Sequence, residues 1–100
     1  MAESKIPRKS IIRLDKSKYV SIGTSPVKVT FTYSIPSGYT LVCPTMYHPY
    51  GVEIVGGMED VGNSSAFGFF QRASGSALSV RFTFCALAIP TEWLHSVSIT

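Results

Sequence analysis

The feature that most constrains the fold is a strict alternation of apolar and polar residues over residues 26–35, PVKVTFTYSI. The apolar members occupy every second position: Val27, Val29, Phe31, Tyr33 and Ile35 alternate with Lys28, Thr30, Thr32 and Ser34. Successive side chains of a β-strand point to opposite faces of a sheet, so this period of two predicts a strand with one apolar face. The turn-forming Pro36-Ser37-Gly38 ends the strand.

Further short β-type runs follow along the chain, and no stretch of any length has a helical period. They cover residues 10–15, 18–22, 39–43, 51–55, 66–72 and 77–89. We expect Pro44, Gly56-Gly57 and Ser74-Gly75-Ser76 to end three of them. A chain of 100 residues has room for a single core. The sequence therefore predicts an all-β fold, a compact antiparallel β-sandwich (jelly-roll-like) over residues 10–100.

The run 77–89, ALSVRFTFCALAI, predicts a contact surface. Its first half alternates, but from Cys85 onward both faces are apolar. The second apolar face needs a cover from a loop, the C-terminal tail or another subunit. Charged residues make up only 15% of the chain, against about 25% in an average one, which also indicates self-association. The expected interface residues are Phe67, Phe69, Cys85, Leu87, Ile89 and Trp93.

Positive charge is concentrated in the first part of the chain. Residues 1–28 contain seven basic and two acidic residues, whereas residues 29–100 contain two basic and four acidic ones. We expect residues 1–9 to form a flexible basic arm. The basic residues of this region that could contact a partner are Lys5, Arg8, Lys9 and Arg13. Such an arm binds nucleic acid, docks on an acidic protein surface or is simply solvated, and the lack of interleaved aromatic residues disfavours nucleic acid.

A search for catalytic chemistry finds no recognisable motif. The sequence lacks a phosphate-binding P-loop and the GxGxxG, GxSxG and HExxH patterns. Glu59 and Asp60 are adjacent, which is more typical of a solvated loop than of two carboxylates converging on one bond. His48 and His95 lack the neighbouring ligands of a zinc site. We expect no enzymatic activity, no cofactor and no bound metal.

The two cysteines do not form the framework of a secreted scaffold. Cys43 and Cys85 each lie in an apolar stretch, where a free thiol behaves as a small buried apolar group, and a disulfide between them is the alternative. No apolar run approaches the length of a membrane span, and the first residues, MAESKIPRKS, lack the apolar core of a signal peptide. These features predict a chain that is made in the cytoplasm and has no membrane span.

The segment 44–50, PTMYHPY, is the strongest candidate for a ligand site. Two tyrosines and a histidine lie between prolines, which predicts a rigid aromatic loop. Aromatic faces beside hydrogen-bonding groups suit sugar rings. The candidate ligand-binding residues are Tyr47, His48 and Tyr50, with Asp60 and Asn63 from a second loop. The alternative is that the two tyrosines simply close one end of the core.

Two segments, YSIPSGYTLV (33–42) and SALSVRFTFCALAI (76–89), resemble the C-terminal head domains of bacteriophage tail fibres and related virion attachment proteins. The resemblance implies a β-sandwich, usually trimeric, that touches host-surface glycans or stiffens a virion. We therefore expect a non-enzymatic virion module, made in a bacterial host, that attaches to glycans as a homotrimer. The alternatives are a decoration or head-fibre protein that docks on other virion proteins through its arm, and a small nucleic-acid-binding protein.

Overall fold

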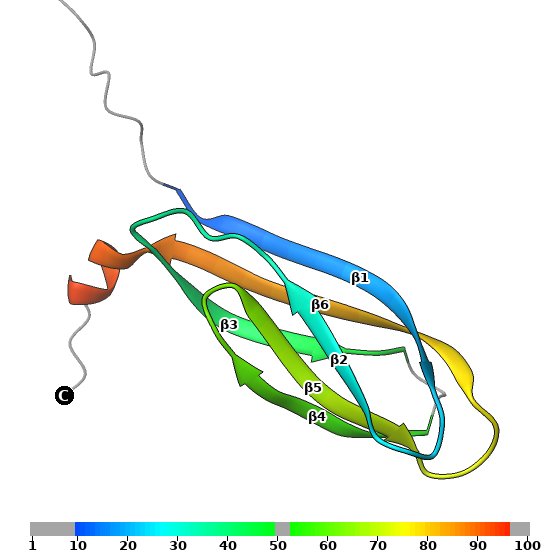
Figure 1. Ribbon diagram of the computed structural model, residues 1–100. Coiled ribbons are helices and arrows are strands. Elements are labelled where there is room, and N and C mark those ends of the chain that lie inside the picture. The colour runs from blue at the N-terminus through cyan, green and yellow to red at the C-terminus, as the bar shows by residue number, and fades with distance from the viewer. Residues whose placement is uncertain (1–9, 50–52, 97–100) are drawn as a thin grey trace, which may run out of the picture.

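The computed structural model describes residues 10–49 and 53–96, which form six strands and one short 3₁₀ helix, η1 (Thr91–Ser96). The strands make two antiparallel three-stranded sheets that face each other as a β-sandwich (Figure 1). The all-β sandwich expected from the sequence is confirmed. In this part of the chain, no helix is long and apolar enough to cross a membrane.

The first sheet, sheet A, has the order β1-β6-β3. Its central strand β6 (Leu78–Pro90) pairs on one side with β1 (Ile12–Ile22) and on the other with β3 (Tyr39–Tyr47). The two runs predicted at 10–15 and 18–22 are joined into the single strand β1, because Lys16 and Ser17 continue the ladder opposite Phe84 and Thr83.

The second sheet, sheet B, has the order β2-β5-β4. Its central strand β5 (Ser65–Arg72) lies between β2 (Val27–Thr32) and β4 (Ile54–Val61). The strand order places β1 beside β2 on one side of the sandwich, and β3 beside β4 on the other (Figure 1).

The core lies between the two sheets and is built mainly from aromatic rings. The central strands meet where Phe70 packs on Phe82, with ring centroids 4.7 Å apart. Phe84 stacks on Phe31 at 5.9 Å and on Tyr33 at 5.1 Å. The apolar face predicted for residues 27–33 is thus the buried face of β2 and of the residue that follows it.

Three predicted strand ends are wrong. β2 ends at Thr32, three residues before the expected end at Ile35, although Tyr33 and Ile35 still pack on the core. β3 continues through Pro44 to Tyr47, with a bulge between Val42 and Thr45 at which Cys43 takes φ 54°. A proline can lie in a strand that has a partner on one side only, because no ladder hydrogen bond is lost on its open side. β4 likewise continues through Gly56 and Gly57. There, a Cβ on Gly56 would stand only 2.9 Å from the Cα of Phe70, so the glycine permits the close approach of β4 to β5.

The apolar second face predicted for β6 lies on the outside of sheet A. Phe84, Ala86 and Ala88 are buried in the sandwich, while Cys85, Leu87 and Ile89 alternate with them and are half-buried. In the described part of the chain, the next strands on this face are β1 and β3, which flank β6 without covering it. Along its outer face, β6 changes from the exposed Ser79 and Arg81 to the half-buried Cys85, Leu87 and Ile89.

Candidate functional site

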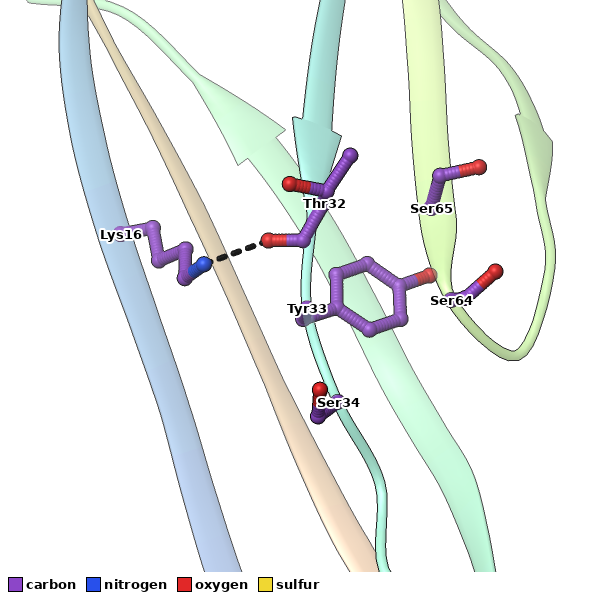
Figure 2. Close-up of a pocket in the computed structure, with 6 residues that line it drawn as sticks. All are labelled: Lys16, Thr32, Tyr33, Ser34, Ser64 and Ser65. Atoms are coloured by element: carbon purple, nitrogen blue, oxygen red, sulfur yellow. Dashed lines mark hydrogen bonds between the residues drawn. The ribbon is translucent and has the colours of Figure 1, made fainter.

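An open groove of about 500 Å³ lies where β1 and β2 meet the turn between β4 and β5. Figure 2 shows the six side chains that line it: Lys16, Thr32, Tyr33, Ser34, Ser64 and Ser65. Five of these carry a hydroxyl group and the sixth an ammonium group, and the lining contains no carboxylate. We call this cavity the hydroxyl groove.

Tyr33 is the most firmly held member of the hydroxyl groove. Its ring stacks on Phe84 with an interplanar angle of 2°, and its hydroxyl donates to the carbonyl oxygen of Gly62 at 2.6 Å. Its backbone N–H donates to the carbonyl oxygen of Ser64 at 3.0 Å. Burial raises the pKa of the Tyr33 phenol, and the nearby carboxylate of Asp60 raises it further, so the phenol stays protonated and continues to donate.

Lys16 closes the other side of the hydroxyl groove. Its Nζ donates to the carbonyl oxygen of Thr32 at 2.5 Å, as the dashed line in Figure 2 shows. Lys18 makes the same kind of bond to the carbonyl oxygen of Thr30, and a smaller cavity of about 200 Å³ continues along this seam. These two carbonyls point away from β5. Because β2 is an edge strand, no further strand pairs with them, and the lysines donate to them instead. An ammonium group has three donors, which leaves Lys16 able to meet a ligand as well.

The structure does not gather the predicted ligand-binding residues into one site. Tyr47 is half exposed, and its hydroxyl is 4.0 Å from Sγ of Cys85, outside sheet A. His48 instead packs edge-on against Phe70 and Phe82, with centroid distances of 6.5 and 5.9 Å. Residues 44–47 belong to β3 and not to a loop, and Tyr50 lies outside the described residues.

Asp60 and Asn63 belong to β4 and to the turn that follows it. Asp60 is in β4 opposite Phe67, and the exposed Asn63 is in the turn that leads to Ser64. Phe70, which contacts His48, is three residues along β5 from Phe67, or roughly 10 Å at 3.3 Å per residue. Asn63 therefore adjoins the hydroxyl groove, while His48 occupies a different part of the sandwich.

The predicted interface residues fall on both outer faces of the sandwich. Phe67 and Phe69 are on the outside of sheet B, where their rings meet edge-on and Nζ of Lys28 lies 4.2 Å from the Phe67 centroid. Phe69 is 41% exposed and Trp93, in η1, is 40% exposed. Cys85, Leu87 and Ile89 lie outside sheet A, so one flat contact could not include all six residues.

The cysteines are free, and they share a cavity of about 190 Å³ with Arg13 on the outside of sheet A. The expectation that both thiols are buried is wrong: Cys43, at the bulge in β3, is exposed, and Cys85 is only half-buried. Arg13 is 3.5 Å from the carboxylate of Asp15. The other basic residues named for the arm, Lys5, Arg8 and Lys9, lie outside the described residues.

Sequence reasoning missed the hydroxyl groove because no local pattern marks it. Serine and threonine are common on the solvent-facing positions of strands and in turns, where Ser34, Ser64 and Ser65 occur. The polar turn 62–65, GNSS, is the local signal for this site, and its Asn63 is among the candidate ligand-binding residues.

The groove offers hydrogen bonds and one positive charge. Within residues 10–49 and 53–96, no three His, Cys, Asp or Glu side chains are close enough together to hold a metal ion. Comparison with family models, with curated proteins and with solved structures found no significant match to this chain.

Proposed function

We propose that this chain is a non-enzymatic attachment module that binds host-surface carbohydrate in the hydroxyl groove. The observation that carries the proposal is the lining of five hydroxyl groups and one ammonium group around an open volume of about 500 Å³. Hydroxyl groups both donate and accept hydrogen bonds, as do the hydroxyls of a sugar ring. The groove and a sugar can therefore form hydrogen bonds in which either one is the donor. The ammonium of Lys16 adds a donor for sugar oxygens, including those of acidic sugars.

The rigidity of the groove supports the same proposal. Tyr33 is fixed by stacking on Phe84 and by two hydrogen bonds, and Lys16 is tied to the backbone of β2. Groups that are already ordered lose little entropy on binding. A few neutral hydrogen bonds in an open groove still give weak affinity, millimolar or about −4 kcal/mol per site. Useful attachment then requires several copies acting together.

We further propose that the module acts as a homotrimer in a phage-like virion. The strand order supports this: sheet A runs β1-β6-β3 and sheet B β2-β5-β4, the arrangement obtained when one long hairpin is rolled up as in a jelly roll. The half-buried Leu87 and Ile89, with Ile11 at 54% exposure, provide apolar surface outside sheet A for contacts between copies. The number three rests on the resemblance to tail-fibre head domains.

The test compares two double variants on an array of bacterial surface polysaccharides. Ser34→Ala with Ser64→Ala removes two hydroxyls from the groove, and Ser21→Ala with Ser79→Ala removes two from exposed paired positions in β1 and β6. Two lost hydrogen bonds at about 1 kcal/mol each predict a fall in affinity of about tenfold or more for the groove variant only.

A third variant separates the hydroxyl groove from the aromatic segment. Tyr47→Ala leaves the groove intact, because Tyr47 lies outside sheet A near Cys85. We expect it to bind the array as the unmodified protein does. Loss of binding in Tyr47→Ala together with full binding in the groove variant would move the site to residues 45–50. Equal binding by all the variants would contradict the groove proposal.

The alternative function is structural: a decoration or head-fibre protein that docks through its basic segment on other virion proteins. It is supported by the concentration of seven basic residues in residues 1–28. A nucleic-acid-binding role would draw on the same charge, and the pairing of Arg13 with Asp15 weakens it. Retention on DNA that falls steeply with salt would identify the nucleic-acid role.

A further inference from the structure

The outer face of sheet B carries a row of side chains that begins at the hydroxyl groove. Ser65 lines the groove, and Phe67 and Phe69 are the next two residues of β5 whose side chains lie on the same face of the sheet. We call these two phenylalanines the aromatic platform. From Ser65 to Phe69 the strand advances by roughly 13 Å, at 3.3 Å per residue. The groove and the platform are therefore successive parts of one surface along β5.

The aromatic platform is open to solvent at Phe69, whose side chain is 41% exposed. The residue opposite it in β4 is Gly57, where an added Cβ would meet no atom of the described residues within 4 Å. A glycine inside a strand often marks a place where a ligand approaches closely. Phe67 meets Phe69 edge-on, with ring centroids 5.9 Å apart, and so supports the exposed ring from the side of the groove. One aromatic ring is thus held in place with free space beside it.

Polar groups flank the aromatic platform on both sides. On β2, the ammonium of Lys28 lies 4.2 Å from the Phe67 centroid, and on β4 the exposed Asp60 is opposite Phe67. The carboxylate of Asp60 also raises the pKa of Tyr33, which shows that it lies within electrostatic reach of the hydroxyl groove. Since the two flanking charges have opposite signs, a strongly charged ligand would be repelled by one of them. An uncharged ligand with hydroxyl groups can bond to both.

We propose that the aromatic platform extends the hydroxyl groove into one site for a linear oligosaccharide, with an uncharged sugar on the platform. One sugar unit occupies the groove, and a later unit of the same chain stacks its apolar C–H face on Phe69. Lys28 donates to hydroxyls of that unit, and Asp60 accepts from them. A single sugar ring cannot reach from Ser65 to Phe69, so the ligand is a chain of several units. The inference rests on the proposed carbohydrate binding and specifies the class and extent of the ligand.

A second copy of this chain is the other occupant that an exposed ring could have. The proposed contact between copies uses the outer face of sheet A, where Leu87 and Ile89 lie, so the outer face of sheet B stays open in that assembly. An apolar contact over the platform would also take the exposed charges of Lys28 and Asp60 out of water, which is costly unless each finds a partner. A sugar hydroxyl bonds to these charges without removing them from solvent. These observations favour the oligosaccharide.

The first test measures affinity against the length of the ligand. The probes are fragments of increasing length, from a single sugar upward, cut from the polysaccharide that binds best on the array, and NMR titration measures each affinity. We expect affinity to rise about tenfold once a fragment is long enough to reach Phe69, and then to level off. An affinity that does not depend on length would contradict the platform and leave the groove proposal standing. Absence of binding by the polysaccharides and all their fragments would contradict the proposed function as well.

The second test removes the exposed ring. We expect Phe69→Ala to bind long fragments about tenfold more weakly and short fragments as before, so that the dependence on length disappears. Tyr19→Ala is the matched control, because it removes an exposed ring from the outer face of sheet A and should bind every fragment normally. The groove variant, Ser34→Ala with Ser64→Ala, should weaken the binding of fragments of every length. Full binding of long fragments by Phe69→Ala would overturn the proposal.

A further variant tests the same surface without removing a ring. Gly57 does not have a positive φ and has free space around it, so Gly57→Leu can place a side chain beside Phe69 without a clash. We expect it to lose the added affinity for long fragments, and full binding of those fragments would contradict stacking on Phe69. Circular dichroism verifies the fold of each variant, and sedimentation velocity without sugar measures its mass. A folded Phe69→Ala protein of lower mass than the unmodified one would show that the platform joins copies of the chain, and would overturn the proposal.

Discussion

Replacing Tyr33 with phenylalanine tests a side chain that belongs both to the core and to the hydroxyl groove. The change removes the hydroxyl that donates to the Gly62 carbonyl at 2.6 Å and keeps the ring that stacks on Phe84. A hydrogen bond of this kind contributes about 1 kcal/mol net. Because Gly62 is exposed, water can take the place of the lost donor, and we expect the free energy of unfolding to fall by about 1 kcal/mol.

The assay is thermal unfolding followed by circular dichroism. For a domain of this size, each kcal/mol corresponds to a shift in Tm of about 4–8 °C. The deficit of Tyr33→Phe should therefore be easy to measure at neutral pH. Tyr33→Leu is the matched control, since it removes the stacked ring as well as the hydroxyl and should lower Tm further.

The pH dependence of the same deficit checks its electrostatic origin. Burial, and to a smaller extent the Asp60 carboxylate, raise the pKa of Tyr33 in the folded state above the ordinary tyrosine value of about 10. Below that value the phenol is protonated in both states, so the full stabilisation is present. As the pH rises above about 10, the unfolded chain loses this proton while the folded chain retains it, and stability is lost.

Phenylalanine has no such proton, so the difference in stability between the two proteins should shrink as the pH rises above about 10. An unchanged Tm in Tyr33→Phe at neutral pH would show that the bond to Gly62 contributes nothing. A difference that stays constant at alkaline pH would show that the phenol is not shielded from water as described.

Three further changes test the core, the outer face of sheet A and the arm. Phe84→Ala removes the ring on which Phe31 and Tyr33 stack, and chemical denaturation should show a loss of about 3–5 kcal/mol. Leu87→Asp places a charge among the half-buried apolar residues outside sheet A; light scattering should show dissociation of the assembly, and an unchanged mass in a folded protein would exclude this face from the contact. Deleting residues 1–9 should leave Tm nearly unchanged, and a loss of several degrees would mean that they are an integral part of the fold.

The strands were predictable where a period of two extends over many residues. In residues 29–33 and 80–84 every second side chain is apolar, and the backbone of a strand turns this spacing directly into one buried face. The ends of strands were less predictable. Pro44 and Gly56-Gly57 are turn signals in isolation, but β3 and β4 each have a partner on one side only, and an edge strand accommodates a proline, a bulge or a glycine pair.

The hydroxyl groove was not predictable from local sequence because distant segments build it. Lys16 comes from β1, Thr32 to Ser34 from the end of β2, and Ser64 and Ser65 from the turn into β5. Their proximity depends on the strand order, which no short motif specifies. The strand order also separates Asn63 from His48, which the sequence predicts in one site, because segments that are close in the chain need not lie at the same end of a sandwich.

The position of β6 has a consequence for the order of folding. All three strands of sheet B are complete by Arg72, whereas sheet A has no central strand until residues 78–90 have been synthesised. Ile12 must then pair with Ala88 across almost the whole length of the chain, and such distant pairings form slowly because a long loop must close first. Until β6 has been synthesised, β1 and β3 have no strand to pair with in sheet A. Their backbone N–H and C=O groups can then form hydrogen bonds with other chains. A nascent chain is therefore especially exposed to aggregation in the interval before β6 leaves the ribosome.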